Sequence, residues 1–397
     1  MREATPTTEQ VRGVLAGVMD PELKASIIDL GMVGDVRVDP DGTVTVPVVL
    51  TTAGCPLRHQ IKVDVESKVL GLPGVESVKV EYGEMTAEQK TAAMSRARFQ
   101  AREHAEPTEV AATTGVLAVA SGNGGVGKSS ITVNLAAALA ARGLAVGVLD
   151  ADIWGFSVPR MLGIDERLGG TDGKIEPVNV AVERTLGTGD PGRLAVVSMG
   201  FLVDDERSAL MWRGLVLTRA LEQFLTDVRW GELDYLLIDM PPGTGDIQMG
   251  LARMLPQAEM LVVTTPALAA QNVATRVADM ARRSHMKVAG VVENMTAFVT
   301  PSGERYPLFG EGGGESLALD IDAPLLARIP IEPAVASGGD CGVPAVLAAP
   351  TGVAAQVFRD LAATIVEDVL PPIEMAGCTA RMMELIGQID APEQPSS

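Results

Sequence analysis

The chain has 397 residues, which at about 150 residues per domain corresponds to two or three domains. Hydrophobic residues make up 47% of it and charged residues 21%, a composition typical of folded globular proteins and not of disordered ones. The formal net charge is −19, and because such a surface repels phosphate groups, we expect neither nonspecific nucleic-acid binding nor attachment to an anionic membrane.

The sequence contains no apolar run of the roughly 18 residues that a membrane span needs. Its first ten residues, M-R-E-A-T-P-T-T-E-Q, lack the apolar core of a signal peptide, so we expect a cytoplasmic protein. The three cysteines, Cys55, Cys341 and Cys378, lie far apart and form no C-x-x-C pair. This spacing argues against a disulfide framework and against a four-cysteine metal site within one chain.

Residues 1–82 predict a small α+β domain. Apolar residues at helical spacing predict a helix over 9–18, and a second helix is expected after Cys55 and Pro56. Strands are predicted over 32–38, 43–50 and 75–81. The turn sequence D-P-D-G joins the first two of these strands.

Residues 83–113 are rich in Ala, Glu, Gln, Arg and Thr and predict a partly helical linker. The segment 114–370 alternates short aliphatic runs with helices, which is typical of a parallel sheet covered on both faces. The predicted strands are 116–121, 144–150, 234–239, 260–265 and 288–294. We therefore expect an α/β doubly wound, mostly parallel sheet that ends in an amphipathic helix over 351–370 and is followed by a tail, 371–397.

A glycine-rich loop lies between the first of these strands and the next helix. The sequence G-N-G-G-V-G-K-S satisfies the phosphate-binding pattern G-x-x-x-x-G-K-[ST] in the strand–loop–helix setting that this pattern requires. Main-chain N–H groups would bind phosphate there, Lys128 would reach the β- and γ-phosphates of ATP, and Ser129 would bind Mg²⁺. The alternative is a turn that only caps a helix. The predicted nucleotide-binding residues are Gly122, Asn123, Gly124, Gly125, Val126, Gly127, Lys128, Ser129 and Ser130.

Carboxylates at strand ends complete the predicted site of a P-loop NTPase. Ligands of an open parallel sheet bind beyond the carboxyl ends of its strands, where Asp150, Asp152 and Asp239 fall. Asp239 is the candidate Mg²⁺ carboxylate, and Asp152 the candidate for orienting the attacking water. Asp150 has the alternative interpretation of a turn residue or helix cap. Gly243 or Gly245 is expected to present a main-chain N–H to the γ-phosphate.

Several further segments resemble the Mrp/ApbC family of deviant Walker A ATPases, which carry iron–sulfur clusters. The resemblance rests on the loop and on D-A-D-I-W-G-F-S-V-P-R, M-W-R-G, I-D-M-P-P-G-T-G-D, V-E-N-M and F-G-E-G-G-G, in this order, and covers about residues 115–370. Residues 1–82 resemble the small iron–sulfur-assembly domain that often precedes it, through D-P-E, I-I-D-L-G-M-V and T-T-A-G-C-P.

The resemblance implies ATP and Mg²⁺ as cofactors, slow ATP hydrolysis and a homodimer. It also implies a labile cluster that is delivered to apo iron–sulfur proteins. The implied partners are these apo-proteins and cluster assembly proteins. Within V-E-N-M, Asn294 matches the position that reads the adenine edge; the alternative is a turn residue at a strand end.

Two positions depart from the family pattern. Asn123 stands where relatives usually have a lysine that reaches the phosphates, so we expect weaker transition-state stabilisation. Many relatives carry C-x-x-C shortly after E-N-M, but Thr300 and Gly303 stand near those positions here. Neither residue offers the thiolate that iron–sulfur clusters require.

The remaining thiols are candidates for a cluster or for thiol chemistry. Cys55 precedes Pro56 at the predicted start of a helix, where the helix dipole favours a reactive thiolate; the alternative is a small buried apolar residue. Cys341 lies in a glycine-rich turn and Cys378 in the tail. The leading hypothesis is therefore an ATP-dependent cluster carrier, and the alternative is an ATP-switched partner-binding protein without a cluster. A positioning ATPase of the ParA/MinD kind is disfavoured, because the chain is acidic and its tail has no basic amphipathic helix.

Overall fold

The structure is a computed structural model that describes residues 5–20, 25–50, 58–103, 107–152, 155–185, 189–202, 214–243, 246–284, 286–300 and 302–372. The chain divides into two compact units, one of residues 1–106 with 281–286 and the other of residues 107–280 with 287–397. Each unit has a hydrophobic core of its own.

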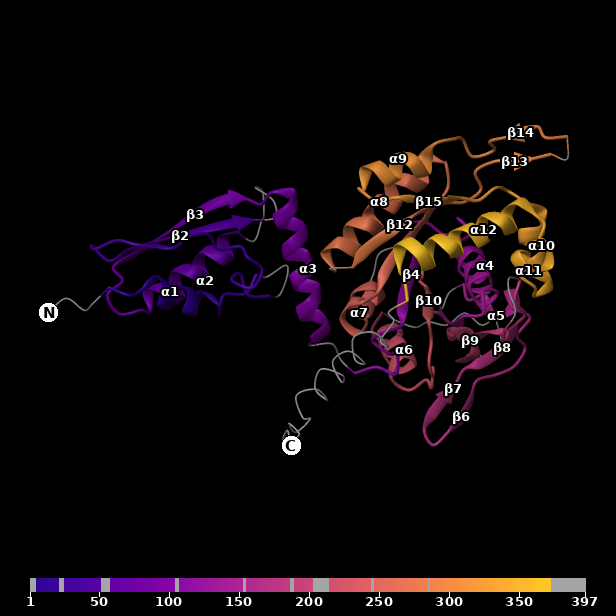
Figure 1. Cartoon of the computed structure of the whole chain (residues 1–397), viewed down its shortest axis with the longest axis horizontal. Helices are drawn as coiled ribbons and strands as arrows, with labels where there is room; N and C mark the ends of the chain where they lie inside the picture. The colour runs from indigo at the N-terminus through magenta and orange to yellow at the C-terminus, as the bar shows by residue number, and fades with distance from the viewer. Residues whose placement is uncertain are drawn as a thin grey trace, which may run out of the picture. The chain divides into compact units, whose positions relative to one another are not determined.

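The first unit is a small α+β fold (Figure 1). Its elements are α1 (Thr8–Leu15), β1 (Arg37–Val38), β2 (Thr43–Leu50), α2 (Arg58–Leu70), β3 (Ser77–Glu84) and α3 (Ala87–Glu103). In the described part of this unit the strands form one sheet in the order β1-β2-β3, with β1 antiparallel and β3 parallel to β2. The predicted α+β class is confirmed.

Local sequence explains where α1 begins, and strand pairing explains the length of β1. Thr7 and Gln10 form a capping box at the start of α1, in which each side chain accepts a hydrogen bond from the other residue's main-chain N–H. Strand β1 is shorter than the predicted 32–38, because only Arg37–Val38 pairs continuously with β2 and Val33 makes an isolated bridge.

Helix α3 lies within the segment predicted as a linker. Its Ala93 and Ala97 are buried and belong to the hydrophobic core of the first unit. Small side chains allow a helix to approach a neighbouring surface closely, so α3 packs on this core without the aliphatic stripe that the sequence lacks.

The second unit contains a large sheet in the order β15-β12-β11-β4-β10-β5-β9-β8 (Figure 1). All neighbouring strands in it are parallel except the edge pair β8 and β9. Its strands are β4 (Gly115–Ser121), β5 (Ala145–Asp150), β8 (Val178–Val182), β9 (Gly192–Ser198), β10 (Tyr235–Asp239), β11 (Glu259–Thr264), β12 (Lys287–Glu293) and β15 (Leu325–Arg328). The predicted mostly parallel sheet is confirmed, and each of its five predicted strands ends within one residue of the observed one.

Helices connect and cover these strands. They are α4 (Lys128–Ala140), α5 (Val158–Met161), α6 (Gly214–Thr226), α7 (Asp246–Met254), α8 (Leu268–Arg283), α9 (Gly313–Asp320), α10 (Pro333–Cys341), α11 (Ala345–Ala348) and α12 (Val353–Thr364). The 3₁₀ turn Met199–Leu202 follows β9, and the π-helical turn Ile365–Val369 extends α12. Two short hairpins, β6 (Gly169–Thr171) with β7 (Lys174–Glu176) and β13 (Phe298–Val299) with β14 (Arg305–Tyr306), complete the unit.

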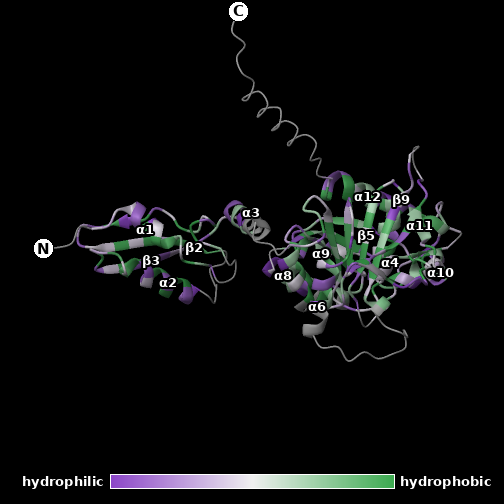
Figure 2. Ribbon diagram, turned by 90° about the horizontal axis from the view of Figure 1, so that it is seen from below, coloured by the Kyte–Doolittle hydropathy of each residue, from purple (hydrophilic) through white to green (hydrophobic). Residues whose placement is uncertain are grey.

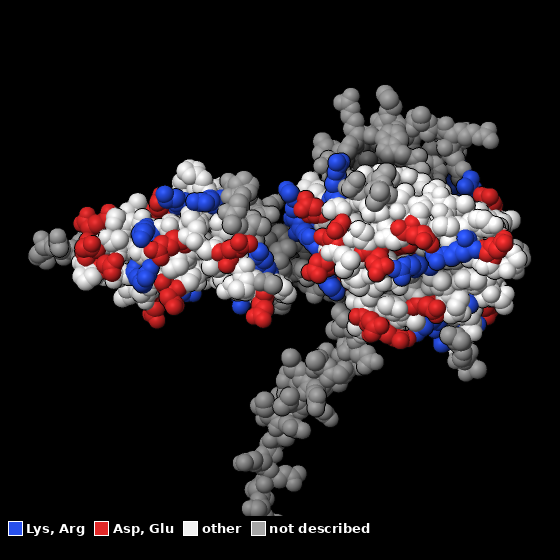
Figure 3. Space-filling model, turned by 90° about the horizontal axis from the view of Figure 1, so that it is seen from above, with Lys and Arg blue, Asp and Glu red and all other residues white. Residues whose placement is uncertain are grey.

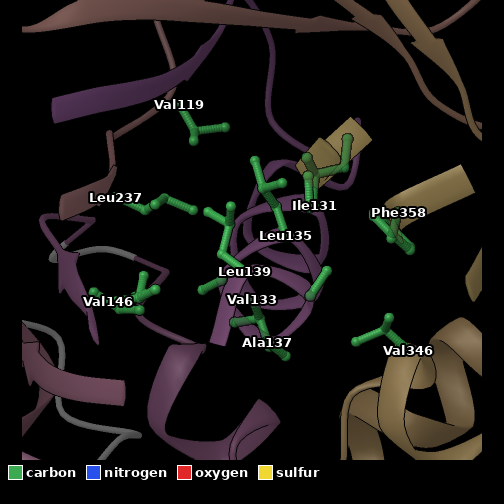
Figure 4. Packing of buried hydrophobic residues seen from close by; sticks show 14 of the residues in the cluster. Val119, Ile131, Val133, Leu135, Ala137, Leu139, Val146, Leu237, Val346 and Phe358 are labelled. Carbon is green, nitrogen blue, oxygen red and sulfur yellow. The ribbon is translucent and has the colours of Figure 1, made fainter. Parts of the chain in front are cut away.

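The P-loop helix α4 forms the centre of the core. It packs against β4, β5 and β10 on one side and against α11 and α12 on the other. Figure 4 shows its apolar side chains between strand residues and the C-terminal helices; the labelled residues are Val119, Ile131, Val133, Leu135, Ala137, Leu139, Val146, Leu237, Val346 and Phe358. Because residues from Ile131 to Ala140 are all buried, the loop that precedes α4 is attached to a rigid support.

Hydrophobic residues lie inside the second unit, and charged residues of both signs lie on the surface. Figure 2 shows hydrophobic residues concentrated in the central strands and helices of the second unit. On the face shown in Figure 3, lysines and arginines lie among acidic side chains. None of the described helices is long and apolar enough to cross a membrane.

Candidate functional site

The predicted phosphate loop connects β4 to α4. Gly125 and Gly127 adopt left-handed conformations with φ of 80° and 81°, which side-chain-bearing residues rarely tolerate. Gly122 lies against helix α8, since a Cβ atom there would come within 2.5 Å of the Val273 carbonyl carbon. The loop therefore needs glycine both for its turn and for its close packing. It ends where helix α4 begins, at Lys128.

Asp239, at the end of β10, gathers the polar side chains of the loop. Its carboxylate is fully buried and accepts hydrogen bonds from Lys128 Nζ at 2.6 Å and Ser129 Oγ at 2.6 Å. Thr132 Oγ1 donates to the same carboxylate at 3.0 Å. Thr132 was not among the predicted residues, although it lies one helical turn after Lys128 and thus on the same face of α4.

Asp152 faces the same lysine from a different strand end. Its Oδ2 lies 4.0 Å from Lys128 Nζ, and its Oδ1 accepts a hydrogen bond from the Gly155 N–H at 3.1 Å. The structure thus brings together the three residues predicted as catalytic, Lys128, Asp152 and Asp239. One ammonium group lies between two carboxylates, so the local charge favours a further cation.

Asp150 is fully buried beside this group and holds the segment that carries Asp152. It accepts hydrogen bonds from the main-chain N–H groups of Asp152 at 3.2 Å and Val158 at 3.3 Å, and from Ser198 Oγ at 3.0 Å. Burial and the neighbouring Asp239 carboxylate raise the pKa of Asp150 to about 8. The hydrogen bonds support the predicted alternative of a turn-stabilising residue.

A cavity of about 390 Å³ opens in front of the loop. It is lined by Ser121, Asn123, Gly124, Gly125, Val126, Gly127, Lys128, Ser129, Ser130, Asp152, Gly155, Ser157, Met161 and Pro242. Most of the predicted nucleotide-binding residues therefore share one surface. Ser157, Met161 and Pro242 were not predicted as site residues. Ser157 and Pro242 lie within the family motifs D-A-D-I-W-G-F-S-V-P-R and I-D-M-P-P-G-T-G-D, but only the fold brings these three residues to the cavity.

Asn294 lies behind the loop instead of on this cavity surface. Its Nδ2 donates to the Val126 carbonyl at 2.8 Å, and a Cβ atom on Gly127 would collide with the same amide. Asn294 thus supports the main chain of the phosphate loop. The Gly243 N–H donates to the Ser121 carbonyl at 3.0 Å, and Gly245 lies outside the described residues.

The turn of the β13–β14 hairpin contains Thr300 and Gly303, the residues that the family resemblance places near the expected cysteine pair. Thr300 Oγ1 shares a hydrogen bond with Ser302 Oγ at 2.8 Å and accepts another from the Glu304 N–H at 3.1 Å. Hydroxyl groups therefore hold this turn, and Gly303 adds no side chain. Cys341 is exposed, while Cys55 and Cys378 lie outside the described residues. Among the described residues there is no group of three or more His, Cys, Asp or Glu side chains that could hold a metal ion.

Comparisons with known proteins cover almost the whole described chain. The sequence profile of the NUBPL iron-transfer P-loop NTPases matches residues 112–366, and that of an iron–sulfur cluster assembly protein matches residues 8–82. An iron–sulfur cluster carrier protein of Mycobacterium leprae is 44% identical over 353 residues, which cover 87% of this chain and 89% of the relative. A protein of the same name from Bacillus subtilis is 37% identical over 326 residues, covering 82% and 88%.

Solved structures provide a further likeness. A nucleotide-binding protein from Archaeoglobus fulgidus, determined in complex with ADP, is 36% identical and covers 59% of this chain and 88% of its own, with a TM-score of 0.48.

Proposed function

The chain belongs to the Mrp/ApbC family of NUBPL-type iron-transfer P-loop NTPases, and we propose that it binds and slowly hydrolyses Mg·ATP and delivers iron–sulfur clusters to apo-proteins. The observation that carries the ATPase part is the convergence of Lys128, Ser129 and Asp152 with Asp239 around one cavity. The cluster part is supported by the family and by the assembly-type first unit.

The residues present suit a magnesium nucleotide. Ser129 would bind Mg²⁺ through its hydroxyl oxygen, and the buried Asp239, which accepts a hydrogen bond from that hydroxyl, would support the ion without contacting it directly. The ion would neutralise charge on the β- and γ-phosphates. Lys128 and the loop N–H groups would bind the phosphates. Asp152 is held at one oxygen by Gly155, and its second oxygen would orient the attacking water and accept its proton.

Several further assignments belong to the same proposal. The protein acts as a homodimer with apo iron–sulfur proteins and cluster assembly proteins as partners, in the cytoplasm. Asn294 remains the candidate for reading the adenine edge, as the family resemblance implies, and its Nδ2 also donates to the Val126 carbonyl.

A second candidate function is an ATP-controlled partner-binding protein that carries no cluster. The β13–β14 turn favours it, because Thr300 and Gly303 stand near the expected cysteine positions and the Thr300 hydroxyl is bound to that of Ser302. Iron in a cluster prefers sulfur ligands, so a cluster in this chain would need Cys55, Cys341, Cys378 or a partner's groups.

Anaerobic reconstitution with iron and sulfide separates the two candidates. A carrier is expected to show a stoichiometric absorbing centre that is lost in Cys55→Ser or Cys341→Ser, while binding of Mg·ATP is unchanged in both variants. A chain that binds Mg·ATP by calorimetry but never holds iron would support the partner-binding function. A chain that binds no adenine nucleotide would contradict both.

A further inference from the structure

We propose that Gln248 is a positioning residue for ATP hydrolysis, which fixes Gly243 at the edge of the phosphate cavity and thereby helps the site to distinguish ATP from ADP. The inference rests on the proposed ATPase function and adds to it a residue that does not itself line the cavity.

Gln248 connects helix α7 to the segment that follows Asp239. It lies in the first turn of α7, and its side chain is buried. Its Nε2 donates to the Gly243 carbonyl at 3.0 Å, while the Gly243 N–H donates to the Ser121 carbonyl at 3.0 Å. Both main-chain polar groups of Gly243 are therefore held, one by α7 and the other by the last residue of β4.

Gly243 depends on these partners for its orientation. Its φ is 91°, and a Cβ atom built on it would meet nothing within 4 Å, so packing does not fix this residue. Glycine has wide conformational freedom, which leaves the two hydrogen bonds to set the direction of its peptide groups. The preceding residue, Pro242, lines the cavity together with Ser121.

This edge of the cavity is where we expect the terminal phosphate. The P-loop lysine reaches the β- and γ-phosphates, and the strand that supplies its carboxylate partner, Asp239, leads directly into Pro242 and Gly243. A disturbance at Gly243 should therefore affect the nucleotide that has a γ-phosphate more than the one that lacks it.

Packing alone does not account for an amide at position 248. The Gln248 Oε1 is buried and has no hydrogen-bond partner among the described residues. Because an unpaired buried oxygen destabilises a fold, a methionine of the same length would fill this space more favourably. The hydrogen bond from Gln248 Nε2 to the Gly243 carbonyl explains why glutamine stands at this buried position.

Gln271 provides a matched control from the neighbouring strand–loop–helix connection. It lies in the first turn of α8, is buried, and donates from Nε2 to the carbonyl of the residue five positions earlier, Pro266, at 3.1 Å. Gln248 and Gly243 have the same spacing and chemistry. Pro266, however, does not line the phosphate cavity.

The test compares Gln248→Met with Gln271→Met in the full chain. Calorimetry with Mg·ADP and with a non-hydrolysable Mg·ATP analogue gives the ratio of the two dissociation constants, and steady-state assays give kcat and KM. In Gln248→Met we expect affinity for ADP within about twofold of the wild type, but about a five- to tenfold loss of analogue affinity and of kcat, as for one lost hydrogen bond. Gln271→Met should leave the ratio unchanged.

An unchanged ratio in Gln248→Met, whatever the change in thermal stability, would overturn the inference and leave Gln248 a structural residue. If Gln248→Met does not fold, Gln248→Asn replaces it in the test. This variant keeps a polar amide but, being one methylene shorter, should lose the hydrogen bond to Gly243, and the ratio of the two dissociation constants again tests the inference. A wild-type chain that binds neither nucleotide would instead refute the proposed ATPase function, so the two failures are distinguishable.

Discussion

Lys128 is nearly buried between the carboxylates of Asp152 and Asp239, and it neutralises charge that would otherwise be trapped in the interior. We expect Lys128→Met to abolish measurable nucleotide binding, to lower ATP turnover by about 100-fold or more, and to destabilise the fold. Calorimetry and thermal unfolding measure these effects. Lys128→Arg keeps the charge and serves as the control; near-normal ATP binding in Lys128→Met would contradict the assigned role.

Asn123 lines the cavity at the position where relatives carry a lysine. Because an amide carries no charge, we expect Asn123→Lys to raise ATP turnover several-fold through added stabilisation of phosphate charge in the transition state. Steady-state hydrolysis assays test this, with Asn179→Lys as a control at an exposed position. If turnover does not rise, the hypothesis that Asn123 weakens transition-state stabilisation is contradicted.

Asp150 makes the stability of the protein depend on pH. Its folded pKa of about 8 lies above its ordinary value of 3.8, so the folded chain retains a proton that the unfolded chain releases between these values. This contribution to the free energy of unfolding is full below about pH 4 and is lost as the pH rises to about 8. An asparagine side chain has no such proton to release, so Asp150→Asn is expected to gain stability relative to the wild type from about pH 5 to about pH 8. Urea titrations at several pH values measure the difference, and a difference that stays constant would contradict the raised pKa.

At the scale of elements, helix α4 is tied to the C-terminal helices by one polar side chain. Asn134 is buried; its Nδ2 donates to the Ser130 carbonyl at 2.8 Å and its Oδ1 accepts from the Val346 N–H at 3.1 Å. We expect Asn134→Ala to lower the free energy of unfolding by about 1–3 kcal/mol, because it leaves the Val346 N–H buried without a partner. Urea denaturation measures this loss. Asn179→Ala removes hydrogen bonds at an exposed position, to the Pro177 carbonyl and from Arg193, and should cost less stability than Asn134→Ala. An equal loss in both variants would refute the role assigned to Asn134.

The sequence predicted the elements whose signals are local. The P-loop, the aliphatic strands around it and the acids at their ends could be predicted because motif, periodicity and strand position agree. The edge strand β8 and its neighbour β9 were missed, although residues 194–197 form a short apolar run, because no helix separates these two strands. Cavity residues such as Met161 could not be predicted, since only tertiary packing brings α5 to the phosphate loop.

At the scale of the whole molecule, each unit buries its own hydrophobic core. We therefore expect the full chain to unfold in two calorimetric transitions, of which Mg·ATP raises only the one that belongs to the nucleotide-binding unit. Differential scanning calorimetry with and without nucleotide measures this, and Lys128→Met should remove the shift. A single transition that moves as a whole would contradict the separate cores.

The hydroxyl-held turn of the β13–β14 hairpin affects how the protein withstands oxygen. A turn shaped by thiolates and iron loses its geometry when air destroys the cluster, whereas threonine and serine hydroxyls do not oxidise under these conditions. We therefore expect this hairpin to keep its shape in aerated solution and without iron.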